Sequence, residues 1–191
     1  MILNQPPIFI KVSALEDLHV IIQNCIRNDR LSQEKLYRHL YSSMFVLCRK
    51  FFHDDHAALE VVNDGMLKVF RALPDYKDDK GSFFNWVYTI VRNTALDKLK
   101  VTIKVTIGSV EEYDELDNTR TILQNLEWKD IYQFLDRLPP ATRMVFSLFY
   151  LEQYKIPEIA ARLEISTGTV KWHLTESRRI MKPVLKKYFT L

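Results

Sequence analysis

Apolar residues recur at steps of three and four through most of the first 70 residues, and this spacing constrains the fold more than any other feature of the sequence. One series is Leu36, Leu40, Phe45 and Leu47, and a second is Leu59, Val62, Met66 and Phe70. Such spacing gathers apolar side chains on one face of an α-helix. Glycine is scarce, with 4 residues in 191, whereas Gly-rich phosphate loops, dinucleotide fingerprints and tight-turned β-sandwiches need more. We therefore predict an all-α chain.

Cysteine usage and the start of the chain indicate the compartment. Cys25 and Cys48 lie in apolar helical contexts and form no C-x-x-C pair, which argues against a zinc ribbon and against a disulfide-stapled secreted domain. The first residues lack the basic region of a signal peptide and contain a proline pair. No window approaches the ~20 apolar residues of a membrane span. We expect a cytoplasmic protein.

Residues 101–124 differ in character from what surrounds them. The first part is β-branched and alternating, and residues 108–117 are acidic. A lone alternating stretch without a partner strand does not form a sheet. We predict a flexible linker here, between two small helical domains at 15–100 and 125–191, with residues 1–14 as an N-terminal extension.

The segment from Ile156 to Met181 has the features of a helix-turn-helix. Ala160 is the small residue needed where the two helices cross, and Ser166 can cap the second helix. Apolar residues at suitable spacing would hold the pair together: Ile159, Leu163, Ile165, Val170 and Leu174. Residues 171–187 are strongly basic. The combination predicts that the second helix enters the major groove of DNA.

Two faces are expected on this second helix. Val170, Leu174, Ser177 and Met181 share the inner one, because they follow the helical repeat. The opposite face and its flanks hold side chains that can contact base edges or phosphates. The candidate DNA-binding residues are Thr167, Thr169, Lys171, Trp172, Thr175, Glu176, Arg178 and Arg179. The alternative is an ordinary helix pair with a solvated basic face.

A second constellation begins at the polar loop 77–82, after which Ser82 can cap a helix that runs towards Lys100. Its apolar stripe contains Phe83 and Trp86, and is expected to be core rather than a stacking platform for bases. The loop and the opposite polar stripe are better candidates for contact with a single strand. These candidates are Lys77, Lys80, Gly81, Ser82, Asn85, Thr89, Arg92 and Asn93.

Together, these blocks resemble the extracytoplasmic function (ECF) sigma factors of the sigma-70 family. Residues 81–100 resemble their promoter −10-binding helix, and residues 138–174 their −35-binding region. Residues 60–70 are similar to the helix that docks on the coiled coil of the polymerase clamp. The resemblance implies a dissociable subunit that binds core RNA polymerase, directs initiation at specific promoters and helps to open the DNA. It places core-polymerase binding at Glu60, Asn63, Asp64 and Leu67.

The resemblance also implies the partners. They are core RNA polymerase, double-stranded DNA at −35, single-stranded DNA at −10 and an anti-sigma factor that clamps between the two domains, with no membrane insertion. The polymerase supplies the catalysis, so we expect no enzyme activity, no catalytic residue, no metal and no cofactor.

Several residues depart from the pattern of that family. Asn63 and Glu60 stand where Gln and Asp are usual in the clamp-binding helix. Trp172 and His173 replace a usual Ser-Arg, and Glu176 replaces a common basic residue. Glu164 occupies the turn position that normally holds glycine, which costs free energy if φ is positive there. These departures bear on the −35 sequence and on affinity for the core enzyme.

Three other classes of protein could account for part of the sequence. A response-regulator-like output domain would have a similar reading helix and would act as a transcriptional regulator rather than a sigma subunit, but it leaves residues 15–100 unexplained. A metal-dependent hydrolase could use the polar residues around the break at 53–60, which are His53, Asp54, Asp55, His56 and Glu60. These residues lie at a helix break, where solvated polar groups are expected. A pure interaction protein would not need the basic reading helix.

Overall fold

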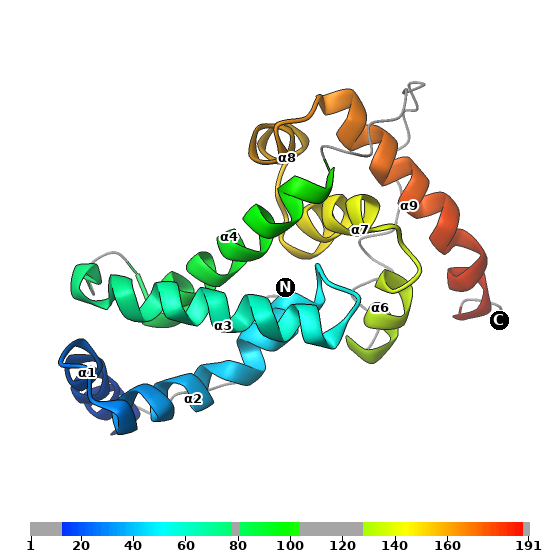
Figure 1. Ribbon diagram of the computed structural model, residues 1–191. Helices are drawn as coiled ribbons and strands as arrows, with labels where there is room; N and C mark the ends of the chain where they lie inside the picture. Colours follow the sequence, from blue (N-terminus) through cyan, green and yellow to red (C-terminus); the bar gives the residue numbers. More distant parts are fainter. Residues whose placement is uncertain (1–12, 78–80, 104–127, 189–191) are drawn as a thin grey trace. The chain divides into compact units, whose positions relative to one another are not determined.

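The computed structural model describes residues 13–77, 81–103 and 128–188, and these form two compact units (Figure 1). Residues 13–49 and 54–95 belong to the N-terminal unit, and residues 50–53 and 96–188 to the C-terminal unit. Every regular element in these ranges is helical, which confirms the all-α prediction for the described part of the chain. Nowhere in these ranges is a helix both long and apolar enough to cross a membrane.

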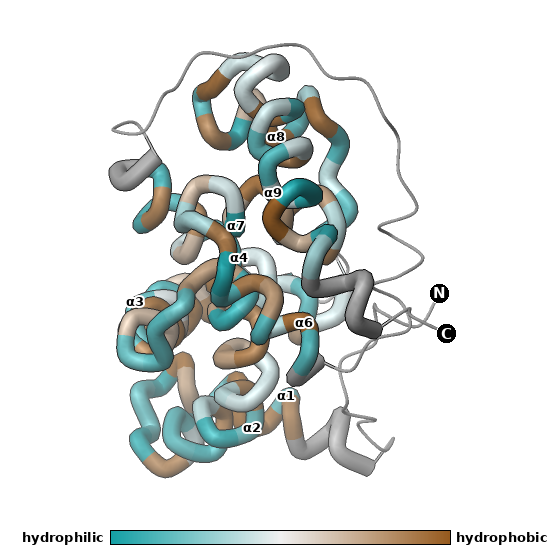
Figure 2. Tube along the Cα trace, turned by 90° about the vertical axis from the view of Figure 1, so that its right-hand side faces the viewer, coloured by the Kyte–Doolittle hydropathy of each residue, from teal (hydrophilic) through white to brown (hydrophobic). Residues whose placement is uncertain are grey.

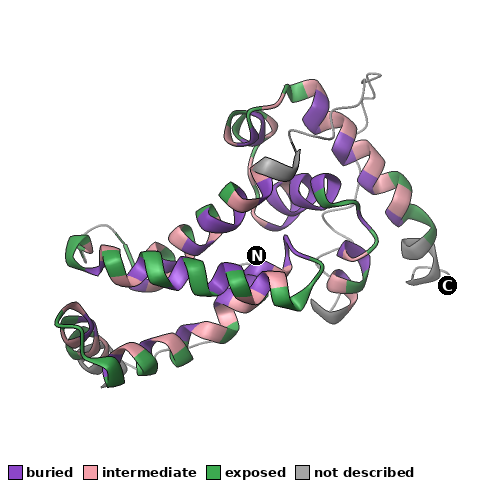
Figure 3. Ribbon diagram, viewed as in Figure 1, coloured by how far each residue is buried: buried purple, intermediate pink, exposed green. Residues whose placement is uncertain are grey.

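The N-terminal unit is built around the antiparallel pair α2 (Arg30–Arg49) and α3 (Asp55–Ala72), against which α1 (Ser13–Ile26) packs. A single 3-10 turn, η1 (Leu73–Asp75), follows α3, and α4 (Phe83–Ile103) follows the loop. The buried faces follow the spacing seen in the sequence, as Figure 3 shows along α2 and α3. Their most deeply buried members include Leu36, Met44, Leu47, Val62 and Met66.

The break between α2 and α3 has a local cause. Asp54 has an extended backbone and caps α3, because its carboxylate accepts hydrogen bonds from the backbone N–H groups of His56 and Ala57, each at 3.1 Å. Asp55 pairs with Arg49 at 2.7 Å. Two of the polar residues at this break therefore have structural roles.

Glycine is needed at Gly65 because α3 and α4 approach closely there. A Cβ at this position would lie 3.0 Å from Cγ2 and 3.1 Å from Cα of Val91. Since one of those atoms is backbone, the contact cannot be relieved by a rotamer change alone.

Both cysteines belong to the core of the N-terminal unit. Cys25 is 2% exposed and Cys48 is fully buried, and both are free thiols. Burial raises the pKa of Cys25 to about 11 and that of Cys48 to about 12. Neither thiol is therefore poised to ionise or to bind a metal near neutral pH.

The C-terminal unit contains α6 (Trp128–Leu135), α7 (Pro140–Phe146), α8 (Ile156–Leu163) and α9 (Thr167–Tyr188). Pro140 stands in the first turn of α7, where its missing N–H costs nothing. A π-helical segment, η3 (Ser147–Leu151), follows α7 directly and interrupts the regular α-helical repeat. The helices α7 and α9 pack together, and α8 packs on α9.

Amphipathic patterning accounts for the arrangement within each unit. Figure 2 shows hydrophobic and hydrophilic residues alternating along the tube, as expected for helices that bury one face. The predicted linker lies almost wholly outside the described residues, and α4 extends to Ile103, into the start of that segment.

Candidate nucleic-acid interface

The predicted helix-turn-helix is present in the C-terminal unit as α8, a short turn and α9. Glu164 ends α8 in the left-handed conformation, with φ 57° and ψ 41°. The N–H groups of Glu164 and Ile165 both reach the carbonyl oxygen of Ala160, which closes the end of the helix. Glu164 is not a glycine and has a positive φ in this turn. The free-energy cost that the sequence analysis made conditional on a positive φ therefore applies.

Ser166 caps α9 as predicted. Its Oγ accepts a hydrogen bond from the backbone N–H of Thr169 at 2.9 Å and lies 2.9 Å from the hydroxyl of the same residue. Thr169 is only 9% exposed. The expectation that Thr169 lies on the outer face of α9 is therefore corrected, because the cap draws its side chain inward.

The inner face of α9 is buried as predicted. Val170, Leu174, Ser177 and Met181 are each at most 3% exposed. His173 joins this face, at 3% exposed, with its Nδ1 3.0 Å from the hydroxyl oxygen of Thr142 on α7. Burial lowers the pKa of His173, and the nearby charge of Glu176 opposes this only in part. The buried ring thus adds a polar contact between α7 and α9.

The outer face of α9 carries the remaining candidates for DNA contact. Thr167 and Arg179 are exposed, and the others are half-buried. Arg178 is drawn back onto the helix, since its Nε donates to the carbonyl oxygen of Leu174 at 3.2 Å. The half-buried members are Lys171, Trp172, Thr175, Glu176 and Arg178.

Glu176 and Arg179 form a two-point contact on this face. Nε of Arg179 donates to Oε2 of Glu176 and Nη2 donates to Oε1, both at 2.7 Å. The hydrogen bond from Arg179 and then its charge lower the pKa of the Glu176 carboxyl, so that it is ionised near neutral pH. Each carboxylate oxygen already accepts one hydrogen bond from Arg179, so a cytosine amino group would have to share an oxygen with the guanidinium.

The second candidate region lies where α4 begins. The Oγ of Ser82 accepts from the N–H of Asn85 at 3.3 Å, as expected for a cap. Gly81 has φ 120°, which favours glycine strongly. The polar stripe of α4 is exposed at Asn85, Thr89 and Asn93 and half-buried at Arg92. Lys77 is exposed, whereas Lys80 lies outside the described residues.

Aromatic rings gather beside this loop. Tyr76 contacts Phe83 and Trp86, with ring centroids 5.1 Å apart in each case, and its hydroxyl lies 3.4 Å from the carbonyl oxygen of Gly81. Phe83 is 7% exposed and Trp86 is half-buried. The two rings are packing residues of the loop, in line with the core prediction for this stripe.

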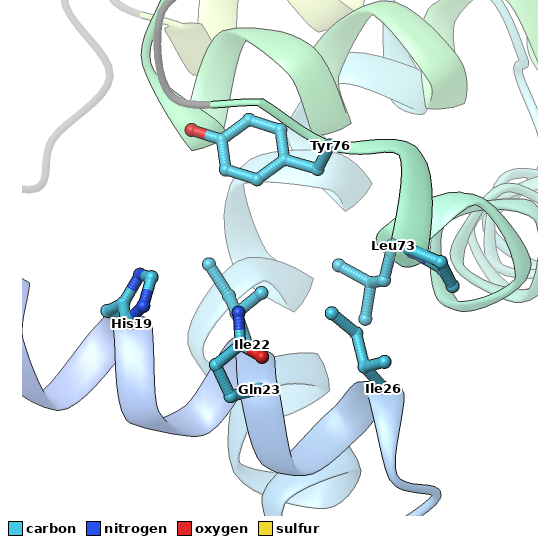
Figure 4. A pocket seen from close by; sticks show the side chains of 7 residues that line it. His19, Ile22, Gln23, Ile26, Leu73 and Tyr76 are labelled. Carbon is cyan, nitrogen blue, oxygen red and sulfur yellow. The ribbon is translucent and has the colours of Figure 1, made fainter.

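Tyr76 also borders a cavity between α1 and η1, shown in Figure 4. The cavity has a volume of about 260 Å³. Its floor is apolar and comes from Ile22, Ile26 and Leu73, while the ring of Tyr76 lies across from the α1 side chains His19 and Gln23.

The third candidate region is one exposed face of α3. Glu60, Asn63, Asp64 and Leu67 follow the helical repeat and are all exposed, and Leu67 is an apolar side chain with 53% exposure. The Oδ1 of Asn63 accepts a hydrogen bond from the hydroxyl of Tyr37 on α2 at 2.7 Å. Tyr37 therefore fixes the orientation of the Asn63 amide.

Two residues that support these regions, Tyr37 and His173, were not identified as such from the sequence. Tyr37 lies far from Asn63 in sequence, and no local spacing indicates their hydrogen bond. His173 was identified only as a departure from the family pattern that bears on the −35 sequence, although its position one residue before the inner-face Leu174 was a signal for burial. Among the described residues, no three or more His, Cys, Asp or Glu side chains are grouped so that they could hold a metal.

Comparisons with known proteins cover both units. A family model for sigma-70 region 2 matches residues 36–102, and a model for sigma-70 region 4 matches residues 128–181. The ECF RNA polymerase sigma factor SigE of Mycolicibacterium smegmatis is 25% identical over 163 residues, which is 82% of this chain and 63% of that protein. The chain thus spans less than two thirds of that relative.

Two further likenesses span nearly the whole of the other protein. The RNA polymerase sigma-H factor of Pseudomonas aeruginosa is 22% identical over 184 residues, covering 87% of this chain and 95% of that protein. Among solved structures, the sigma factor RpoE of Bartonella quintana, in complex with the anti-sigma factor NepR, is 17% identical, with a TM-score of 0.46 over 80% of this chain and 96% of that chain.

Proposed function

Because the chain belongs to the ECF sigma factors of the sigma-70 family, we propose that it binds core RNA polymerase in the cytoplasm and directs initiation at specific promoters. The observation that carries the proposal is α9: a capped helix with a buried inner face and with Lys171, Trp172 and Arg179 on its outer face. This division is what a helix needs to be held by its own unit and still enter the major groove. No step of the proposed function requires the protein itself to make or break a covalent bond.

Within this proposal, the C-terminal unit reads the −35 element. Residues near the start of α9 contact base edges, as in other helix-turn-helix proteins. Thr167 is exposed there, and Trp172 offers an apolar surface to a thymine methyl group. Lys171 contacts phosphate and sets the register.

The N-terminal unit takes the −10 strand at the loop 77–82 and the polar stripe of α4. Opening a duplex loses stacking of ~1.4 kcal/mol per step, and contacts to the unstacked strand offset this loss. Gly81 gives the loop a backbone shape that other residues adopt poorly. The exposed amides of Asn85 and Asn93 supply donors and acceptors for the strand.

The exposed face of α3 binds the core enzyme. Leu67 offers exposed apolar area at the edge of a polar patch formed by Glu60, Asn63 and Asp64, and this mixture is common in protein interfaces. An anti-sigma factor that covers the DNA-contacting surfaces is a further expected partner, as the family implies.

Run-off transcription tests the proposal. Purified chain is mixed with sigma-free core polymerase and genomic fragments from the same source. Discrete transcripts that need both proteins are expected. Leu67→Glu should abolish them and lower the affinity for core enzyme, while Leu31→Glu, at a 69% exposed leucine on α2 outside this face, should leave them unchanged.

The other outcomes separate the alternatives. Transcripts that appear only after a housekeeping sigma factor is added would identify a helix-turn-helix regulator instead. No transcripts and no binding to core enzyme would overturn the proposal for the N-terminal unit, and DNA binding by α9 would then stand alone.

A further inference from the structure

The contact between Glu176 and Arg179 puts an acid on the face of α9 that is proposed to meet DNA. We propose that Glu176 is a specificity-determining residue that fixes Arg179 as an oriented clamp for one backbone phosphate. The inference rests on the proposed function, since it concerns the same reading helix. It goes further by assigning a role to the one acidic residue on that face.

The geometry of the guanidinium supports this role. Arginine has five N–H donors in a planar fork. Glu176 engages Nε and one hydrogen of Nη2, so the edge formed by Nη1 and the second Nη2 hydrogen points away from the acid. That edge can still take a pair of oxygen acceptors side by side.

Exposure agrees with this orientation. The Arg179 side chain is 73% exposed, whereas the Glu176 side chain is 23% exposed. The acid therefore lies against the helix and the arginine extends beyond it. Glu176 restricts a side chain that would otherwise sample many rotamers, so less conformational freedom is lost when Arg179 meets a fixed acceptor.

The position along the helix selects a phosphate as the acceptor. Arg179 lies about 18 Å from Thr167 along the axis, at ~1.5 Å per residue. The bases are contacted from the first turns of a reading helix, and the major groove is only about 12 Å wide. A side chain this far along the helix meets the sugar–phosphate backbone.

The acid has a consequence that a lone arginine would not have. Affinity for DNA comes largely from neutralised phosphates and is independent of sequence, so Glu176 weakens binding to all DNA. The loss is offset only when α9 is docked so that the fixed edge of Arg179 meets its phosphate, and base contacts at the start of α9 favour that docked orientation on the preferred sequence. Glu176 thus raises discrimination by penalising looser orientations on other DNA. Exposed ion pairs contribute little to stability, so this role can be tested without unfolding the protein.

The experiment uses holoenzyme assembled from the full chain and core polymerase. Wild-type holoenzyme first selects a preferred duplex from random DNA. Binding to that duplex and to a scrambled duplex of equal length is then measured at 50–200 mM salt for E176Q, R179Q and the double variant. The matched control is E34Q, which removes the acid of a similar exposed pair, Glu34–Arg38 at 2.7 Å on α2.

We expect E176Q to bind scrambled DNA more tightly and to lower the ratio of preferred to scrambled affinity by about threefold or more. On scrambled DNA, Arg179 of E176Q can neutralise one additional phosphate. The slope of log affinity against log salt concentration then steepens by ~0.9, so the affinity falls by about a further 3.5-fold between 50 and 200 mM salt. In the R179Q background, E176Q should change both affinities equally, because the acid acts through Arg179. E34Q should match the wild type.

Three results would overturn the inference. One is an unchanged ratio in E176Q, and another is the same fall in ratio whether or not Arg179 is present. The third is a loss of preference at a single base pair in R179Q, which would make Arg179 a reader of a base. A wild-type holoenzyme that selects no DNA would instead overturn the proposed function, and the inference with it.

Discussion

The buried histidine of the reading helix makes the stability of the C-terminal unit depend on pH. His173 is 3% exposed, and its Nδ1 lies 3.0 Å from the hydroxyl oxygen of Thr142. Burial lowers the pKa of His173 from its ordinary value of 6.5 in the unfolded chain. The folded unit therefore binds fewer protons at this site than the unfolded chain, so its stability falls as the pH drops below 6.5.

The size of the effect has an upper limit. One proton bound only by the unfolded chain changes the free energy of unfolding by about 1.4 kcal/mol per pH unit. The unfolded histidine is already half protonated at its own pKa, so integration from pH 6.5 to pH 5.5 gives a loss of about 1 kcal/mol at most. Above pH 7.5 the contribution of this histidine to the pH dependence should vanish.

His173→Asn isolates the effect. The asparagine amide can take the place of Nδ1 beside Thr142 but does not titrate, and the lost ring volume should cost about 1–2 kcal/mol at every pH. Urea unfolding at several pH values is followed by Trp172 fluorescence in a Trp86→Phe/Trp128→Phe background, because a chain of two units need not unfold in one transition. We expect the wild type to lose stability below pH 6.5 more steeply than the variant.

The other histidines are present in both proteins, so their contributions cancel in the comparison. Equal pH slopes for the wild type and His173→Asn would refute the reasoning. A steeper loss in the variant would do the same.

Three further changes have expected outcomes that urea unfolding can measure. Ser166→Ala removes the cap of α9 and should destabilise the C-terminal unit by about 0.5–2 kcal/mol, with Ser42→Ala, on the exposed face of α2, as a neutral control. Glu164→Gly relieves a left-handed backbone and should stabilise the same unit by about 0.5–1 kcal/mol; a destabilised variant would contradict the backbone argument. Gly65→Ala forces α3 away from Val91 and should destabilise the N-terminal unit by about 1–2 kcal/mol despite the better helix propensity of alanine, and unchanged stability would show that α4 can yield.

The helix-turn-helix could be predicted from rules that involve only residues close together in the sequence. Ser166 was recognised as a cap and Glu164 as a costly turn residue because both properties depend on a few neighbouring residues. The inner face of α9 followed from the helical repeat alone. Secondary structure and caps are therefore well determined by the sequence in this region.

The structure departs from the sequence-based predictions where side chains form hydrogen bonds with one another or where segments distant in sequence meet. Thr169 was placed on the outer face by the repeat, but its hydroxyl meets Ser166 and the residue turns inward. The bond between Tyr37 and Asn63 joins two helices and has no local signature. The π-helical turn after Phe146 depends on how an almost wholly buried segment packs, which helical periodicity cannot indicate.

The two buried thiols make it possible to measure how often the N-terminal unit opens. The thiolate is the form that attacks a thiol-modifying reagent, and at pH 8 neither Cys25 nor Cys48 ionises appreciably while it remains buried. Their modification rates therefore report how often the surrounding helices open. Since the described C-terminal unit contains no cysteine, the rates distinguish opening of one unit from opening of the other. Under the proposed function, core enzyme bound at α3 should slow modification of Cys48 without any engineered label.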